Sequence, residues 1–248
     1  MYGPIFYTAA RTEALLRAEA ILRKQGCRFA SEPELSVTHL LLDVPSFAAD
    51  GSLRCGGTLT DILPSLSPQV KICGGLLEGH IPEGYQAVDL LADPYYVAEN
   101  ARITAYCATR LAMDRLPCIL YGCPVLIIGW GRIGKCLGKL LRDMGARVTV
   151  AARKASDRAM LEALGYDSLS TEGLGYSLVR FRVVFNTAPE LILSAEDMVY
   201  APEEQLKIEL ASRPGMEASD VIRAGGLPGK DAPESSGALI AQTLLRLK

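Results

Sequence analysis

The sequence predicts an α/β protein with two parallel-sheet domains joined by a long helix. Three features support this fold class. Short apolar runs rich in β-branched residues alternate with segments of helical periodicity, as in parallel sheets covered by helices. An uninterrupted helical pattern at 97–116 separates two such regions. In the second region a glycine-rich turn stands directly between a strand and a helix.

The first region alternates between short strands and helices. Strands are predicted at 4–8, 27–30, 37–44 and 70–73, and helices at 12–24 and 58–66. His39 lies inside the third strand, so we expect a structural role and keep a catalytic one as the alternative. Residues 45–57 are rich in Ser, Gly and Asp, which predicts a loop at the end of a strand, where open sheets often carry ligand contacts.

One long helix follows. Asp93 and Pro94 are expected to break the chain, and the helical pattern then runs over 97–116 and ends at a proline. Thr104 and Tyr106 lie on this helix. For Thr104, packing and a functional role are equally open.

The glycine-rich turn carries the most specific signal. Residues 124–128 form an apolar strand, Gly129, Gly131 and Gly134 follow at G-x-G-x-x-G spacing, and residues 147–151 form the next strand. In such units the glycines permit a tight turn, close approach of a pyrophosphate, and close packing of helix on strand. We therefore predict a Rossmann-type dinucleotide site, with a plain glycine-rich turn as the alternative. Its first cofactor-binding residues are Gly129, Trp130, Gly131, Arg132, Ile133 and Gly134.

The end of the second strand predicts which nucleotide binds. Sites for NAD usually place Asp or Glu there to accept hydrogen bonds from the ribose 2′-OH. This chain has Ala152, Arg153, Lys154 and Ser156 there, with no carboxylate before Asp157. A guanidinium can bind a 2′-phosphate through paired hydrogen bonds. We predict NADP, with NAD as the second choice and a solvated basic turn as the alternative.

Polar groups also end two later strands. Strands are predicted at 183–186 and 204–210, after a helix at 158–163. The residues predicted to hold the nicotinamide ribose and shape the floor of the site are Asn186, Thr187, Ala188 and Pro189, and Ser212 is a further predicted cofactor-binding residue. Arg213 would project at the same sheet edge and clamp a substrate carboxylate, with a solvated arginine as the alternative.

The chain ends in a glycine- and proline-rich loop at 225–233, which contains Lys230, and a last helix at 238–247 capped by Ser235 or Ser236. Four parts are thus expected: a flavodoxin-like substrate domain, an interdomain helix, a Rossmann domain, and a C-terminal helix that could pack back on the first domain. Their ranges are 1–96, 97–117, 118–234 and 235–248.

Composition excludes several functions. The chain has 248 residues, a net charge of −2 and 49% hydrophobic residues, without a basic patch that would bind nucleic acid. No apolar run reaches the roughly 18 residues of a membrane span. Its seven cysteines form no C-x-x-C pair, so we expect buried thiols in a reducing cytoplasm. Its two histidines are far apart in the sequence, so we expect no metal site. We also expect a homo-oligomer.

From about Asn100 onward the chain resembles the dipicolinate synthase A-subunit family of spore-forming bacteria. The motifs that carry the resemblance are the glycine turn, Ala152-Arg153, Asn186-Thr187-Ala188-Pro189, Leu210-Ala211-Ser212-Arg213-Pro214-Gly215 and Gly226-Leu227-Pro228-Gly229-Lys230-Asp231-Ala232-Pro233. The last two motifs are the most specific for this family. The resemblance implies a fold like that of formate and glycerate dehydrogenases and a role in sporulation. It also implies a nicotinamide-dependent step that forms pyridine-2,6-dicarboxylate from a cyclic dihydro- or tetrahydrodipicolinate precursor. The implied partner is a flavoprotein B subunit.

The chain departs from the family on the long helix. Asn100 and Thr104 match, whereas Tyr106 and Cys107 stand where the family has Glu and Gly. If that glutamate carries protons, Tyr106 would replace it poorly near neutral pH.

We therefore predict an NADP(H)-dependent oxidoreductase, with Arg213, Tyr106, Lys230 and Thr104 as catalytic residues and Glu99 as a further proton-carrier candidate. One alternative is a nucleotide-binding subunit with impaired catalysis. Another is a 2-hydroxyacid dehydrogenase-like reductase of a small carboxylate, which would need a histidine in the second half of the chain.

Overall fold

The computed structural model describes residues 3–9 and 12–247. The chain divides into two compact units. The first unit comprises Met1–Asn100 and Pro228–Lys248, and the second comprises Ala101–Leu227. Both units are built on parallel sheets, so the predicted α/β class with two parallel-sheet domains is confirmed.

In the described residues of the first unit, five parallel strands form a sheet of order β2-β1-β3-β4-β5. This order is that of flavodoxin-like sheets. The strands are β1 (Ile5–Thr8), β2 (Arg28–Phe29), β3 (His39–Leu41), β4 (Lys71–Gly74) and β5 (Gln86–Asp89). The sequence did not predict β5, whose side chains are polar or small and only partly covered.

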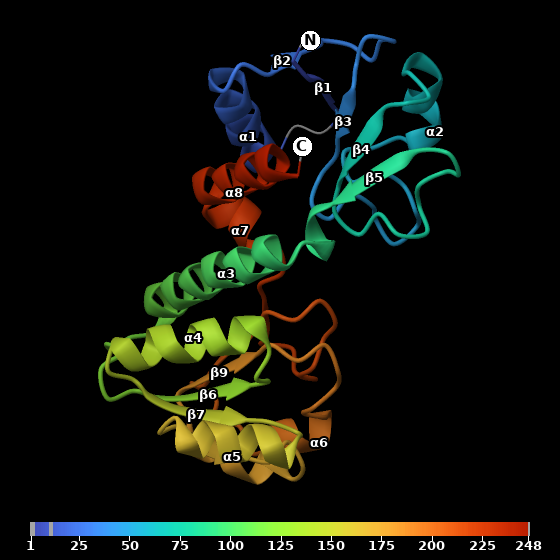
Figure 1. Cartoon of the computed structure of the whole chain (residues 1–248). Coiled ribbons are helices and arrows are strands. Elements are labelled where there is room, and N and C mark those ends of the chain that lie inside the picture. The colour runs from blue at the N-terminus through green and yellow to red at the C-terminus, as the bar shows by residue number, and fades with distance from the viewer. Residues whose placement is uncertain (1–2, 10–11, 248) are drawn as a thin grey trace. The chain divides into compact units, whose positions relative to one another are not determined.

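The helices of the first unit cover the two faces of this sheet. The helices and 3-10 turns of this unit are α1 (Glu13–Lys24), α2 (Leu59–Ile62), η1 (Leu63–Ser65), η2 (Leu90–Ala92), α7 (Leu227–Asp231) and α8 (Pro233–Arg246). Figure 1 shows α1 and α8 side by side on one face and α2 on the other. Leu40 and Ile72 lie in the core beneath α2.

Helix α8 packs closely on α1 because it carries Gly237. A Cβ on Gly237 would lie 2.5 Å from the Ala14 carbonyl and 2.9 Å from the Ala18 nitrogen. The prediction that Ser235 or Ser236 caps this helix was wrong, since Ala232 is the N-cap residue and Pro233 begins the helix. The predicted loop at 225–233 contains α7, and Lys248 lies outside the described residues.

Helix α3 (Pro94–Arg115) belongs to both units, which divide after Asn100. The predicted break at Asp93 and Pro94 lies between η2 and α3, but the long helix begins at Pro94 itself and not at Val97. Pro94 is the first helical residue, where a missing N–H costs nothing, and Asp93 Oδ1 accepts the Tyr96 N–H at 2.7 Å. Arg246 of α8 donates to the same oxygen at 2.6 Å, and this hydrogen bond is the main cause that lowers the pKa of the Asp93 carboxyl.

Within its described part, the second unit contains six parallel strands in the order β11-β10-β9-β6-β7-β8. They are β6 (Pro124–Ile128), β7 (Arg147–Ala151), β8 (Asp167–Leu169), β9 (Val183–Asn186), β10 (Leu206–Glu209) and β11 (Ile222–Arg223). Numbered from β6 along the chain, this is the 3-2-1-4-5-6 order of the Rossmann fold. The short edge strands β8 and β11 were not predicted.

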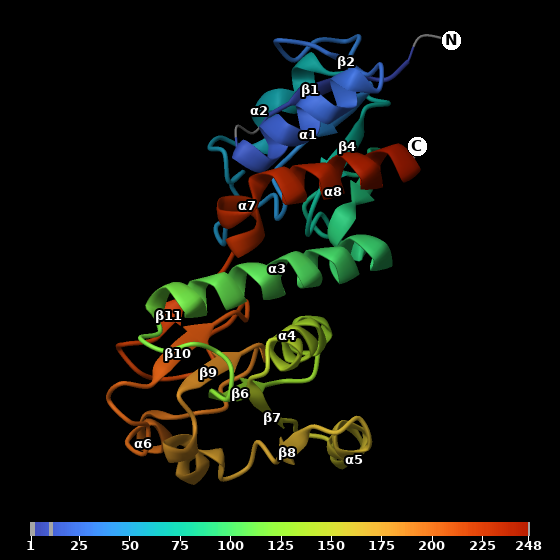
Figure 2. The ribbon, with the colours of Figure 1, turned by 90° about the vertical axis from the view of Figure 1, so that its left-hand side faces the viewer.

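Helices cover both faces of this sheet as well. They are α4 (Arg132–Asp143), α5 (Ala155–Ala163), the 3-10 segment η3 (Leu174–Arg180) and α6 (Ala195–Met198). Figure 2 shows α4 and α5 on one side of the sheet and α6 on the other. Helix α5 begins at Ala155 and not at Arg158 as predicted.

The unit boundaries differ from the predicted domain boundaries in two places. Residues 228–234, which were predicted to lie in the Rossmann domain, belong to the first unit. The first unit also extends to Asn100 and so takes the first turns of α3, which begins at Pro94 and not at Val97.

The thiols are less uniformly buried than predicted. Cys55 and Cys118 are exposed and Cys136 is partly exposed, whereas the other cysteines are buried, and all those described are free thiols. Within residues 3–9 and 12–247, no helix has the length and hydropathy of a membrane span.

We expect Gly237→Ala to lower the free energy of unfolding by about 1–3 kcal/mol, because the added methyl group overpacks the contact between α8 and α1. Gly229→Ala in α7 is the control, since a Cβ there meets no atom within 4 Å. It should leave stability unchanged or raise it. Urea unfolding of both variants measures the difference, and equal stabilities would contradict the close α1–α8 contact.

Candidate functional site

The candidate site lies where the strand order of the second sheet reverses. Strands β6 and β9 are neighbours there, and Gly129 and Thr187 follow their carboxyl ends directly. In open α/β sheets, ligands bind in the crevice outside the carboxyl ends at such a switch point. The glycine turn predicted from sequence therefore stands at the place where this fold binds ligands.

Steric contacts make two of the three glycines obligatory. Gly129 has φ +100°, and a Cβ on it would lie 2.6 Å from Thr187 Oγ1. A Cβ on Gly134 would clash with the Gly129 carbonyl, so α4 packs on the turn only with glycine at this position. The contact fixes the start of α4 against the end of β6.

The third glycine faces open space. A Cβ on Gly131 would meet no atom within 4 Å, and Gly131 is the N-cap residue of α4. The first residue of the helix, Arg132, is exposed. The open position, the helix N-terminus and the exposed cation suit the pyrophosphate of a dinucleotide. The residues present therefore fit this group.

Two side chains predicted to contact the cofactor have partners within the protein. Thr187 Oγ1 donates to the Ile128 carbonyl at 2.9 Å and packs against Gly129. The Trp130 ring packs edge-on against Tyr166, with ring centroids 5.4 Å apart.

A buried carboxylate that sequence reasoning missed ties β9 to β10. Glu209 is 2% exposed, and its Oε1 accepts the Asn186 side-chain amide at 2.7 Å. Its Oε2 accepts the Gly215 N–H at 2.8 Å, and Arg223 lies 3.9 Å away. Asn186 is fully buried and also holds both backbone groups of Ala188. Asn186 therefore links β9 to β10, and its side-chain amide is engaged within the protein.

The Glu209 contacts shape the turn that carries Ser212 and Arg213, both of which are exposed. The Ala211 N–H donates to Glu209 Oε1 at 3.2 Å, and a Cβ on Gly215 would clash with the Asn186 amide. Among residues 3–9 and 12–247, no carboxylate pairs with Arg213. Its guanidinium is available to an anionic ligand.

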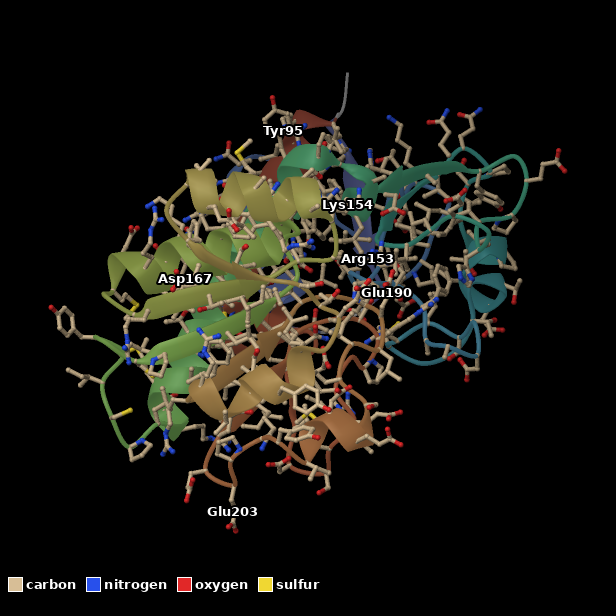
Figure 3. All side chains as sticks on the ribbon, turned by 90° about the horizontal axis from the view of Figure 1, so that it is seen from below. Tyr95, Arg153, Lys154, Asp167, Glu190 and Glu203 are labelled. Carbon is tan, nitrogen blue, oxygen red and sulfur yellow. The ribbon has the colours of Figure 1, made fainter. Side chains whose placement is uncertain are left out.

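Arg153 follows β7, and its Nη1 donates to Glu190 Oε2 at 2.8 Å (Figure 3). The backbone beneath it is anchored, because Arg158 Nη1 donates to the carbonyls of Ala152 and Arg153, each at 2.8 Å. Lys154 is the N-cap residue of α5, and Ser156 lies in the first turn of that helix. Both are exposed. The predicted 2′-phosphate residues thus share one strand end, with Glu190 as an additional neighbour.

The four predicted catalytic residues lie in different places. Lys230 is on α7 in the first unit, whereas Thr104 is buried on the part of α3 that belongs to the second unit. Tyr106 is 57% exposed on the same helix. The pKa of the Lys139 ammonium, in the second half of α4, is raised mainly by its hydrogen bond to Asp143. Tyr166 and Tyr106 make smaller contributions in the same direction. These surroundings differ from the strand ends around Arg213.

The first unit has polar groups at its own switch point, between β1 and β3. Asp43 follows β3 and is buried, and this burial raises the pKa of its carboxyl against the opposing effects of Thr12 and Arg54. Ser46 Oγ donates to the Asp43 carbonyl at 2.7 Å and accepts the Gly75 N–H at 3.0 Å. These contacts order the start of the loop predicted at 45–57.

The two histidines pack on aromatic rings. His39 stacks on Phe6 with ring centroids 4.8 Å apart, and His80 stacks on Phe47 at 4.2 Å. Both belong to the first unit. In the described residues, no group of three or more His, Cys, Asp or Glu side chains has the arrangement of a metal site.

A known protein is similar to the chain in sequence over about half its length. The A subunit of dipicolinate synthase from Bacillus subtilis is 28% identical over 145 residues, which are 55% of this chain and 49% of the relative. The resemblance drawn from the motifs is confirmed. The matched segment spans about half the length of that relative. No family model matches the chain.

Solved structures extend the similarity to the whole fold. The crystal structure of the dipicolinate synthase A subunit from Bacillus halodurans matches with a TM-score of 0.86 at 19% identity, covering 100% of this chain and 98% of that chain. D-lactate dehydrogenase from Escherichia coli matches with a TM-score of 0.62 at 13% identity, covering 98% and 95%. The fold is therefore one that dipicolinate synthase A subunits share with a dehydrogenase.

We expect Glu209→Ala to lower the free energy of unfolding by about 2–4 kcal/mol, because it leaves the Asn186 amide and the Gly215 N–H without their acceptor. Glu204→Ala, at an exposed position before β10, should change stability by less than about 0.5 kcal/mol. Urea unfolding compares the variants, and hydrogen exchange at Gly215 reports on the turn. Unchanged protection of that amide would contradict the role of Glu209 in holding it.

Proposed function

We propose that the chain is an NADP(H)-dependent oxidoreductase of the dipicolinate synthase A-subunit type. The observation that carries this proposal is the glycine turn at the switch point of a Rossmann sheet. Gly129 and Gly134 are sterically required there, while Gly131 faces open space. A turn that only connected two elements would not need an open position at a helix N-terminus beside an exposed arginine.

In this proposal the carboxyl ends of three strands, β6, β7 and β9, each bind a different part of the coenzyme. Backbone N–H groups at the start of α4, together with Arg132, hold the pyrophosphate. Arg153, Lys154 and Ser156 hold the 2′-phosphate at the end of β7. The backbone of Ala188 and Pro189 faces the ribose, because the side chains of Asn186 and Thr187 are already engaged.

The substrate is a cyclic dicarboxylate. When bound, the coenzyme would supply a hydride acceptor, so that a dihydropyridine dicarboxylate loses a hydride and a proton and becomes aromatic pyridine-2,6-dicarboxylate. Arg213 orients one carboxylate through paired hydrogen bonds, and the lack of a carboxylate partner among the described residues leaves its fork available for this role. The proposed partners are a second copy of the chain and a flavoprotein B subunit.

The similarity to D-lactate dehydrogenase gives the second candidate, a reductase of small 2-oxo acids. The two histidines weigh against it, because both stack on aromatic rings in the first unit. A thermal-shift screen with NADPH, NADH, pyruvate and pyridine-2,6-dicarboxylate, followed by turnover assays, separates the candidates. Stabilisation by NADPH and the dicarboxylate supports the proposal, whereas turnover of 2-oxo acids would replace it.

Arg153→Ala should raise the dissociation constant of NADPH by about 10- to 100-fold and that of NADH by less than about threefold, because only NADPH carries the 2′-phosphate. Arg180→Ala is the control. Arg180 precedes β9 and so lies toward the amino ends of the strands, opposite the carboxyl ends where the coenzyme is proposed to bind. Calorimetric titration measures both constants. Equal losses for the two nucleotides would remove Arg153 from the phosphate site.

Arg213→Ala should raise the KM for the dicarboxylate by about 10- to 100-fold and leave the affinity for NADPH unchanged. Arg213→Lys keeps the charge but loses the planar fork, so its KM should fall between those of the wild type and the alanine variant. Steady-state kinetics at saturating coenzyme make the measurement. An unchanged KM in Arg213→Ala would exclude the clamp.

A further inference from the structure

The Arg153–Glu190 ion pair joins two strand ends that are not neighbours. Arg153 follows β7 and Glu190 follows β9, while β6 lies between these strands in the sheet. With a strand spacing of about 4.8 Å, the carboxyl ends of β7 and β9 are about 10 Å apart. The ion pair therefore crosses the carboxyl end of β6, where the glycine turn begins.

The backbones of both partners are held in place. The carbonyl of Arg153 accepts a hydrogen bond from Arg158. Glu190 follows a proline, and its carbonyl lies so close to Gly215 that a Cβ there would be 2.7 Å from it. The Gly215 N–H is bound in turn by the buried Glu209. The Glu190 side chain thus starts from a fixed point beside Arg153.

The side chains themselves can exchange partners. Those of Arg153 and Glu190 are 67% and 56% exposed. Exposed ion pairs contribute little stability, because water and salt screen the charges and two long side chains must be ordered. A ligand with a stronger negative charge can therefore displace the Glu190 carboxylate from the guanidinium.

We propose that Glu190 is a specificity-determining residue of the coenzyme site. Its carboxylate competes with the 2′-phosphate of NADP for the Arg153 guanidinium, and it can accept a hydrogen bond from the 2′-OH of NAD. Sites for NAD usually have a carboxylate at the end of the second strand, and β7 has none there. In this proposal Glu190, from the segment after β9, supplies that carboxylate. This inference rests on the proposed nucleotide site. It adds that Glu190 reduces the preference of the site for NADP over NAD.

The two nucleotides make opposite demands on the pair. A 2′-phosphate repels the Glu190 carboxylate and needs the whole guanidinium fork, so Glu190 must turn away. A 2′-OH is neutral and can donate to Glu190 while the ion pair stays intact. Removing the negative charge of Glu190 should therefore favour NADP over NAD.

The test measures dissociation constants of NADPH and NADH by calorimetry for the wild type, Glu190→Gln, Arg153→Ala and the double variant. Glu203→Gln is the matched control, because it removes one exposed negative charge and Figure 3 shows Glu203 well apart from Arg153 and Glu190. Thermal unfolding of each variant establishes that it folds.

We expect Glu190→Gln to tighten NADPH binding by about 3- to 10-fold at low salt, and to leave NADH binding unchanged or weaker. The gain should shrink at high salt and fall below about twofold in the Arg153→Ala background, because the competition requires Arg153. Glu203→Gln should change the ratio of the two affinities by less than about twofold.

Two results would overturn the inference while leaving the nucleotide site in place. One is an unchanged ratio of NADPH to NADH affinity in Glu190→Gln. The other is an equal gain with and without Arg153. If neither nucleotide binds the wild type or any variant, the proposed function fails and the inference fails with it.

Discussion

The buried carboxylate of Glu209 is the interaction on which the edge of the second sheet depends. A desolvated charge must be compensated, and here the Asn186 amide and two backbone N–H groups donate hydrogen bonds while the Arg223 guanidinium lies 3.9 Å away. Because these groups come from β9, from β11 and from the turn after β10, satisfying one charge fixes neighbouring strand ends together. Arg213 is exposed on the turn held in this way.

The glycine turn applies a second, purely steric constraint on the other side of the switch point. Gly134 allows α4 to touch the Gly129 carbonyl, and the Thr187 hydroxyl fills the space that a side chain on Gly129 would need. Thr187 follows β9, the same strand that Asn186 ends. The electrostatic constraint therefore acts on Asn186 and the steric constraint on the next residue, Thr187. Neither constraint fills the space beside Gly131, which stays open.

The sequence predicted the features that local sterics encode and missed those that depend on distant partners. G-x-G-x-x-G spacing is readable because two of its requirements are local, namely the positive φ of Gly129 and the contact of Gly134 with the Gly129 carbonyl. Asp93-Pro94 was also local, and the break was recognised, but the pattern of an N-cap followed by proline was not read as the start of the helix. Glu209 could not be recognised, since a carboxylate ending an apolar strand looks solvated until Asn186, 23 residues earlier, is known to face it. The Arg153–Glu190 pair spans 37 residues and is equally invisible in the sequence.

Burial distinguishes two carboxylates that lie near the carboxyl ends of the same sheet. Glu209 is 2% exposed and engaged by several donors, so exchanging its partners would strand a charge away from water. The Glu190 side chain is 56% exposed, and water can replace its ion pair with Arg153 at small cost. A group that builds the site must resist exchange, whereas a group that discriminates between ligands must permit it. The solvent exposure of each carboxylate suits one of these two tasks and not the other.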